Sequence, residues 1–276
     1  MPRVSIVIPN FNQHKYLPAC VDHCWFQTHA DLELIIVDGG STDGTKDYLR
    51  QLPDELNLTE SNPILRMDEA GNILHKRCKS FREDTHATHP ERILKIIASE
   101  TDLGRTGTYN AGFAQVTGEY CTYIVGDDLP HPHMIEELAA TLDATGADLA
   151  YSDFSIISDD DRIMRLVRKP DYDFKACFAD WFHIGVSTLH RASWLQKTGL
   201  MDESFQFAND YAHYLRMAMH GARFVHVPRV LYSVRFHGAM TQHEESSRLA
   251  LLAREFLAQG GVEGGARPSL AAQASK

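Results

Sequence analysis

A short run of aromatic and β-branched residues, Tyr120–Val125, leads through Gly126 into two adjacent carboxylates, Asp127 and Asp128. The pattern is typical of a buried strand that ends in acidic side chains. In an open α/β sheet, ligands bind outside the carboxyl ends of the strands, so this pair would lie where a metal ion and a phosphate could be held. An Asp-Asp pair after a strand can also form a polar turn or cap the next helix, so the rest of the chain is needed to choose.

Three earlier apolar runs, Val4–Pro9, Leu32–Val37 and Ile93–Ala98, are each followed by a polar loop. Helical patterns separate these runs and follow the acidic pair, at about residues 16–28, 107–116 and 134–145. Strands that alternate with helices of this length predict an α/β fold, in which a mostly parallel, Rossmann-like central sheet has helices on both faces.

Small antiparallel additions are expected at three places. Residues 52–92 form an irregular insertion with a short hairpin, and residues 156–167 form a second hairpin that turns at Asp159–Asp161. Residues 223–234 are expected to form two short strands around Pro228.

Composition restricts the classes of protein. The 276 residues, 43% of them hydrophobic, are enough to build one large core. No apolar run is long enough to cross a bilayer, and residues 1–10 lack the layout of a secretory signal. Five scattered cysteines favour reduced thiols over a disulfide framework. The net charge of -10 argues against nucleic acid as a partner.

The loop after the first strand excludes one further class and argues against another. Residues Pro9, Asn10, Phe11 and Asn12 contain no glycine, whereas a dinucleotide-binding strand is followed by a glycine pattern. A sugar nucleotidyltransferase would need a basic, glycine-rich loop here to hold a nucleoside triphosphate. It remains a weaker alternative.

The order of these segments resembles the GT-A-fold glycosyltransferases, specifically the inverting enzymes of family 2 that use nucleotide-sugar donors. The resemblance extends to about Gln242, and its parts are Val4–Asn12, Ile35–Thr45, Asn110–Tyr120, the Asp127-Asp128 strand, Gly199–Arg216 and Arg235-Phe236-His237. It implies one GT-A domain over residues 1–242, with a nucleotide-binding half at about 1–130 and an acceptor-binding half at about 131–242. Residues 243–276 are expected to form a helical extension and a disordered tail.

The same resemblance assigns residues to roles. The nucleotide-binding residues would be Pro9, Asn10, Phe11, Asn12, Asp38, Arg105 and Asp127. Asp128 is the first choice for a ligand of Mn²⁺ or Mg²⁺, which would stabilise the charge on the departing diphosphate. His237 is either a further metal ligand or a surface histidine.

Asp210 is the candidate catalytic residue, because inverting transfer needs a carboxylate that takes the proton of the attacking hydroxyl. Its alternative role is to cap the helix that follows. Two departures from the family pattern, Val125 at the first acidic position and Tyr109 in place of Arg, leave a catalytically degenerate nucleotide-sugar-binding protein as the alternative.

The expected substrates are a nucleotide-sugar donor, a UDP-sugar by default, and a hydroxyl acceptor that the sequence does not identify. Cell-surface polysaccharide or glycan synthesis is the usual setting of bacterial relatives. It would place the protein in the cytoplasm, at the inner face of the membrane. The sequence does not indicate an oligomeric state.

Overall fold

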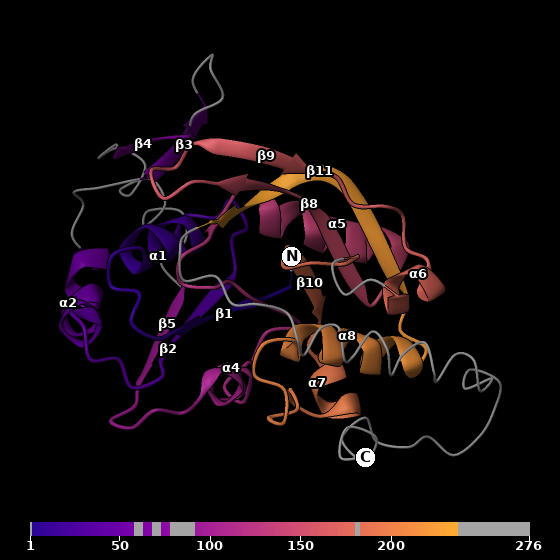
Figure 1. The fold of residues 1–276 in the computed structure, drawn as a ribbon, viewed down its shortest axis with the longest axis horizontal. Helices are drawn as coiled ribbons and strands as arrows, with labels where there is room; N and C mark the ends of the chain where they lie inside the picture. Colours follow the sequence, from indigo (N-terminus) through magenta and orange to yellow (C-terminus); the bar gives the residue numbers. More distant parts are fainter. Residues whose placement is uncertain (1, 58–62, 68–72, 78–91, 180–182, 237–276) are drawn as a thin grey trace.

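The computed structural model describes residues 2–57, 63–67, 73–77, 92–179 and 183–236. Within these residues, one nine-stranded sheet has the order β5-β2-β1-β6-β10-β8-β11-β7, and β9 pairs with β8 (Figure 1). Its strands are β1 (Val4–Asn10), β2 (Leu32–Asp38), β5 (Ile93–Ala98), β6 (Tyr120–Tyr123), β7 (Leu129–Pro130), β8 (Leu149–Ile157), β9 (Ile163–Val167), β10 (Thr188–Arg191) and β11 (Phe224–Arg235).

The first four strands of this order form the parallel part of the sheet. β1 pairs in parallel with β2 and β6, and β2 pairs in parallel with β5. The register places Asn10 beside Asp38 at the carboxyl ends of β1 and β2. Polar residues that follow different strands are therefore brought to one edge of the sheet.

The other half of the sheet is mixed. β10 is antiparallel to both β6 and β8, β11 is parallel to β8, and β7 and β9 are antiparallel edge additions. A mostly parallel sheet with small antiparallel additions was expected and is confirmed. The hairpins were also expected: β9 follows β8, and β3 (Pro63–Met67) pairs with β4 (Ile73–Arg77).

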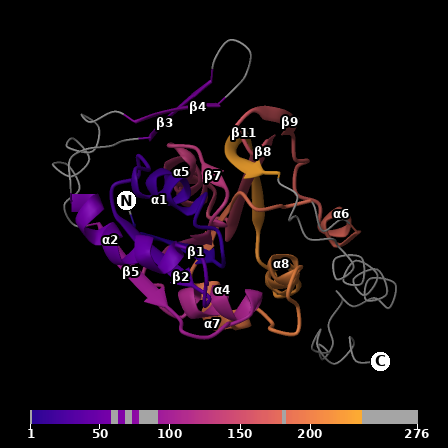
Figure 2. The same ribbon diagram turned by 60° about the vertical axis from the view of Figure 1, so that its left-hand side comes forward.

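Helices cover both faces of the sheet (Figure 2). They are α1 (Leu17–Trp25), α2 (Thr45–Asn57), α4 (Arg105–Phe113), α5 (Met134–Thr145), α6 (Phe174–Ala179), α7 (Ser193–Thr198) and α8 (Asn209–Met219). Side chains of a strand point alternately to its two faces. Accordingly, Val4, Ile6 and Ile8 of β1 pack in a core with α1, α2 and α5, whereas Val7 packs in a second core with α4, α7 and α8.

Several predicted boundaries were wrong. The strand that leads to the acidic pair ends at Tyr123, so residues 124–128 form a loop, which we call the acidic loop. Residues 52–57 belong to α2, which continues through Pro53. Residues 224–235 form one strand, because β11 absorbs Pro228 at an irregularity in its pairing with β8 between Val227 and Val230.

Some expectations lie outside the described residues. They concern the turn of the first hairpin, the end of the insertion and the extension after residue 242. No helix among the described residues is long and apolar enough to span a bilayer.

The close packing of α4 on β1 gives a first prediction. A Cβ atom on Gly112 would overlap the side chain of Val7 and lie 3.1 Å from Val37, so Gly112→Ala should lower the free energy of unfolding by about 1–3 kcal/mol. Gly107 of the same helix is the control, because its Cβ would meet Leu103 at an ordinary 3.7 Å. Gly107→Ala should stabilise the protein by up to about 1 kcal/mol through helix propensity. Urea denaturation measures both, and equal effects would contradict the packing argument.

Candidate active site

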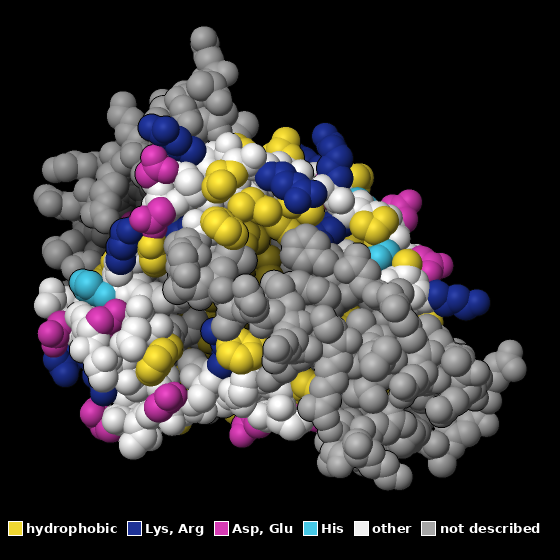
Figure 3. Space-filling model, viewed as in Figure 1, with side chains coloured by type: hydrophobic (Ala, Val, Ile, Leu, Met, Phe, Trp, Pro, Cys, Tyr) yellow, Lys and Arg dark blue, Asp and Glu magenta, His cyan; other side chains and the backbone are white. Residues whose placement is uncertain are grey.

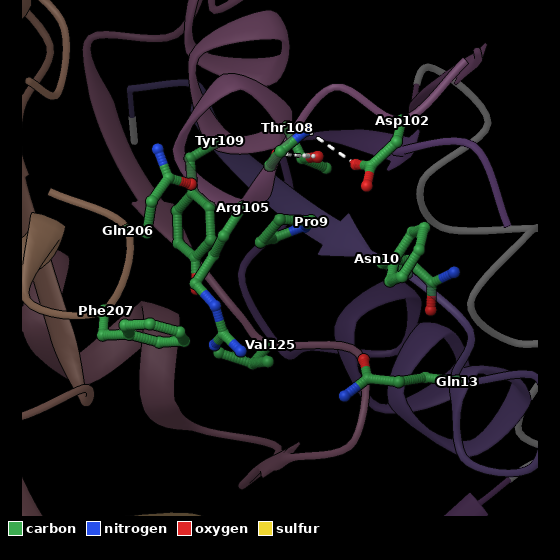
Figure 4. A pocket seen from close by; sticks show the side chains of 12 residues that line it. Pro9, Asn10, Gln13, Asp102, Arg105, Thr108, Tyr109, Val125, Gln206 and Phe207 are labelled. Carbon is green, nitrogen blue, oxygen red and sulfur yellow. Dashed lines mark hydrogen bonds between the residues drawn. The ribbon is translucent and has the colours of Figure 1, made fainter. Parts of the chain in front are cut away.

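A cavity of about 410 Å³ opens at the carboxyl edge of the parallel strands (Figure 4). It brings together residues from the end of β1, the first turns of α4, the acidic loop and the loop before α8. The lining residues are Pro9, Asn10, Phe11, Gln13, Asp102, Gly104, Arg105, Thr108, Tyr109, Val125, Gln206 and Phe207. Four of the predicted nucleotide-binding residues, Pro9, Asn10, Phe11 and Arg105, therefore lie around one cavity.

Two aromatic rings stand at this cavity and remain partly exposed. Phe11 is 46% exposed and Phe207 is 44% exposed. Arg105 is the first residue of α4, and its guanidinium lies 4.9 Å from the centre of the Phe207 ring. Figure 4 shows the Arg105 side chain extending along Tyr109 toward Phe207. The cavity thus offers flat apolar surfaces together with a cation.

Behind the cavity, Asn10 and Asp38 form a buried polar layer. The carboxylate of Asp38 accepts hydrogen bonds from the backbone N–H of Ser41 at 3.3 Å to each oxygen, and it is not among the lining residues. The Asn10 amide nitrogen lies 3.5 Å from Asp38 Oδ1. Asn10 Oδ1 is buried without a hydrogen-bond partner among the described residues. Such an acceptor is costly to leave unpaired, and a turn of the buried Asn10 side chain would present it to a donor from a ligand.

Asn12 joins two loops and does not line the cavity. Its backbone N–H donates to Ser41 Oγ at 2.8 Å, and its side-chain oxygen accepts from the backbone N–H of Thr42 at 2.8 Å. It adopts a φ of 53°, a conformation that asparagine tolerates better than most residues. We conclude that Asn12 holds the loop after β1 against the loop after β2.

The two carboxylates of the acidic loop differ in accessibility. Asp127 is half-buried, whereas Asp128 is buried and accepts hydrogen bonds from Tyr232 Oη at 2.9 Å and from the backbone N–H of Arg235 at 2.8 Å. Burial and the neighbouring charge of Asp127 raise the pKa of Asp128 well above its ordinary value. No cluster of three His, Cys, Asp or Glu side chains suited to a metal ion occurs within the described residues. A cation held by a carboxylate of the acidic loop could take further ligands from water and from a substrate, which is a common arrangement for Mg²⁺ at phosphates.

Asp210 lies in the first turn of α8. Tyr123 Oη, at the end of β6, donates to Asp210 Oδ2 at 2.7 Å, and the backbone N–H of Tyr211 donates to Oδ1 at 2.7 Å. Burial raises the pKa of Asp210, although these hydrogen bonds and the charge of Arg105 oppose the shift. Its bond to Tyr211 does contribute to the helix start, but α8 already begins at Asn209. The bond from Tyr123 has no part in capping.

An aromatic pair connects Asp210 to the cavity. The ring of Tyr109, which lines the cavity, packs edge-on against that of Tyr123 with 5.0 Å between centroids. Burial raises the pKa of both tyrosines above the ordinary value, so they stay protonated and Tyr123 remains a donor to Asp210. Tyr123 was not predicted as a site residue, because an aromatic residue in a strand is typical of the core. Gln206 and Phe207 were not predicted either, because no motif marks them. His237 lies outside the described residues.

The raised pKa of Asp210 predicts a pH dependence of stability. Between the ordinary pKa and the raised one, the folded protein keeps a proton that the unfolded chain releases, so this group lowers the free energy of unfolding as pH rises. Asp210→Asn removes that contribution. The stability of the variant relative to the wild type should rise with pH across this window, by at most about 1.4 kcal/mol per pH unit. Urea denaturation at several pH values tests this, and a pH-independent difference would contradict it.

Comparison with known proteins gives a consistent family. A model of glycosyl transferase family 2 matches residues 5–66 and 76–210. An uncharacterized glycosyltransferase of Nostoc sp. is 29% identical over 147 residues, which are 52% of this chain and 35% of that protein. One from Rickettsia typhi is 24% identical over 259 residues, which cover 90% of this chain and 68% of that protein. This chain thus spans only about a third of the Nostoc relative.

Solved structures agree on the fold. The Staphylococcus aureus protein TarS, residues 1–349 in complex with UDP-GlcNAc, superposes with a TM-score of 0.65 at 15% identity, over 91% of this chain and 66% of that chain. The mannosyltransferase PcManGT from Pyrobaculum calidifontis, in complex with GDP-Man and Mn²⁺, gives 0.59 at 18% identity, over 97% and 66%. The fold is that of GT-A glycosyltransferases. The family model matches well over half of the residues of this chain, so the chain belongs to glycosyl transferase family 2.

Proposed function

We propose that this chain is an inverting glycosyltransferase that moves a sugar from a nucleoside-diphosphate sugar to a hydroxyl acceptor. The observation that supports this most directly is the link between the cavity and Asp210. Tyr109 lines the cavity, Tyr109 packs on Tyr123, and Tyr123 donates to Asp210. A place for a donor therefore lies near a partly buried carboxylate that could act as a base.

The cavity suits a nucleoside. Pro9 and Phe11 provide flat apolar surfaces for a base, and the unpaired Oδ1 of Asn10 could accept a hydrogen bond from a ring N–H. Uracil, thymine and guanine each keep a ring N–H when they are part of a nucleoside, whereas adenine does not. A UDP-sugar remains our first choice, supported by the UDP-GlcNAc complex of TarS. A direct role for Asp38 would require the base to reach behind Asn10.

Arg105 is the candidate for the diphosphate. Family members often have Arg where this chain has Tyr109, and Arg105 lies one helical turn earlier on α4 and also faces the cavity. Its guanidinium could neutralise phosphate oxygens. We assign Asp127 as the metal ligand of the acidic pair, because it is the more accessible of the two, whereas Asp128 is only 4% exposed. When bound, Mn²⁺ or Mg²⁺ would offset the negative charge of the departing diphosphate.

In the proposed reaction, Asp210 accepts the proton of the acceptor hydroxyl. The hydroxyl oxygen forms a bond to the anomeric carbon as the bond from that carbon to the β-phosphate oxygen breaks. One attack from the face opposite the leaving group inverts the anomeric configuration. The hydrogen bond from Tyr123 orients the Asp210 carboxylate, and the elevated pKa makes it a stronger base than an exposed aspartate.

Titration of UDP, dTDP and GDP, each with and without Mn²⁺, tests the donor site by calorimetry. We expect one nucleotide to bind and Mn²⁺ to strengthen its binding. Arg105→Met should weaken binding about tenfold by removing a charged contact, and Asp127→Asn should remove the effect of Mn²⁺. Arg50→Met and Asp47→Asn, both on α2, are exposed controls that should bind as the wild type does. Failure of all three nucleotides to bind would refute the proposal.

Asp210→Asn should separate binding from transfer. The variant keeps the shape of the side chain but cannot take a proton, so the rate of transfer or of donor hydrolysis should fall about 10²–10⁴-fold. Nucleotide affinity should stay within about twofold of the wild type, since Asp210 does not line the cavity. In the active wild type, the rate should rise with pH through the raised pKa of Asp210. An Asp210→Asn enzyme with full activity would rule out the assigned base.

A catalytically degenerate binding protein is the second candidate, and one observation favours it. Val125 lines the cavity at the position where the family usually has an acidic residue. Nucleotide binding without transfer or hydrolysis in the presence of Mn²⁺ would support that candidate.

We also propose a setting in cell-surface glycan synthesis, at the cytoplasmic face of the membrane. A PGL/p-HBAD biosynthesis glycosyltransferase of Mycobacterium bovis is 30% identical over 154 residues, which cover 55% of this chain and 46% of that protein. This similarity supports a glycan or glycolipid product.

A further inference from the structure

The carboxyl end of β11 lies against the acidic loop, although the two segments are far apart in the sequence. Tyr232 and Arg235 follow Asp128 by 104 and 107 positions. They bind both of its carboxylate oxygens, one through a phenol and one through a backbone N–H, at 2.9 and 2.8 Å. Tyr232 is fully buried and Arg235 is 4% exposed, so water does not compete for these bonds.

Arg235 makes further contacts to the same loop and to two other segments. Its Nε donates to the backbone carbonyl of Asp127 at 2.9 Å. Its Nη1 donates to the carbonyls of Ser158 and Asp159 at 3.2 and 3.1 Å and lies 2.6 Å from Asp161 Oδ1. Ser158, Asp159 and Asp161 belong to the turn between β8 and β9, which we call the β8–β9 turn.

The β8–β9 turn is in turn connected to the start of α1. Asp159 forms an ion pair with Lys15 at 2.6 Å and accepts a hydrogen bond from Tyr16 Oη. The Arg235 guanidinium lies 5.0 Å from the centre of the Tyr16 ring. One buried side chain thus joins the acidic loop, the β8–β9 turn and α1, which come from both halves of the chain.

The acidic loop is short and has one backbone bond of its own, from the N–H of Asp128 to the carbonyl of Val125 at 3.0 Å. The direction of the Asp127 side chain depends on how this turn is fixed on the sheet. Asp128 is only 4% exposed, so a carboxylate that is bound inside the protein through both oxygens fixes the turn and offers little surface to a ligand.

We propose that Tyr232 and Arg235 are positioning residues, which hold Asp128 and thereby aim Asp127 at the donor. Asp128 then acts within the protein, which leaves the more accessible Asp127, two residues after the cavity-lining Val125, to serve the donor. This inference rests on the proposed function, because it assumes that the acidic loop serves a nucleotide-sugar and its metal ion. Nothing in the order of residues 127 and 128 separates the two roles, which come from the contacts of β11.

The test compares two tyrosine-to-phenylalanine variants. Tyr232→Phe removes the hydroxyl that binds Asp128. Tyr151→Phe is the matched control, because Tyr151 is equally buried on β8 and also donates one hydrogen bond, to the carbonyl of Pro170 at 2.8 Å. Arg235→Lys is a second variant that keeps the charge and the backbone bond but loses the bonds of the guanidinium. The measurements are calorimetric affinity for Mn²⁺ with UDP, dTDP or GDP, hydrogen exchange of the peptide that spans residues 124–129, and melting temperature.

We expect Tyr232→Phe and Arg235→Lys to weaken Mn²⁺-dependent nucleotide binding at least about tenfold, as loss of a residue that supports a metal ligand does. Hydrogen exchange in residues 124–129 should be faster than in Tyr151→Phe, at a similar melting temperature. Wild-type affinity in Tyr232→Phe would overturn the positioning role and leave the proposed function intact. Equal weakening in Tyr232→Phe and Tyr151→Phe would also overturn it, because a general loss of stability would then explain both. Absence of nucleotide binding by the wild type would overturn the proposed function and the positioning role together.

Discussion

The parallel pairing of β1 with β2 and β6 is the constraint on which the candidate site depends. It brings the loops after all three strands to one edge of the sheet, so that Asn10, Asp38 and the acidic loop meet. The strands themselves are almost entirely apolar and buried, and two hydrophobic cores hold them from opposite faces. Hydrophobic packing of the strands therefore determines the positions of the polar groups in the loops that follow them. Loops placed in this way need little regular structure of their own.

The second half of the sheet completes the site from another direction. α8 places Asp210 within reach of Tyr123, and β11 closes against the acidic loop. Figure 3 shows that the apolar side chains on this face gather toward the middle of the molecule, with Lys, Arg, Asp and Glu more often at its margins. The candidate site is thus built by both halves of the chain, although most of the cavity lining comes from the first.

Much of the parallel half of the fold could be predicted, because its strands are apolar runs of ordinary length and its helices have a clear period. Pro9, Asn10, Phe11 and Arg105 were also predicted and do line one cavity. The prediction was wrong at Pro228, where it divided one strand into two. The pairing with β8 that keeps this strand continuous is not visible in the sequence.

The partners of the carboxylates could not be predicted for a related reason. Asp127 and Asp128 are adjacent and chemically identical, and the contacts that Tyr232 and Arg235 make to Asp128 distinguish them. Tyr123 lies 87 positions from Asp210, and in a strand its ring resembles any other core residue. Sequence patterns report local structure and burial, whereas these hydrogen bonds depend on how distant segments meet.

The bond between β11 and the acidic loop has a consequence for the order of folding. β11 is the last strand along the described chain, so its bonds to the acidic loop can form only after the other strands of the sheet have been added. β1, β2, β5, β6 and α4 can assemble while β11 is still absent, and these elements with the loops that follow them carry most of the cavity lining. A folding intermediate of this kind would have most of the nucleotide pocket but a loose acidic loop. The ability to hold a donor correctly would then appear only when the last described strand has docked.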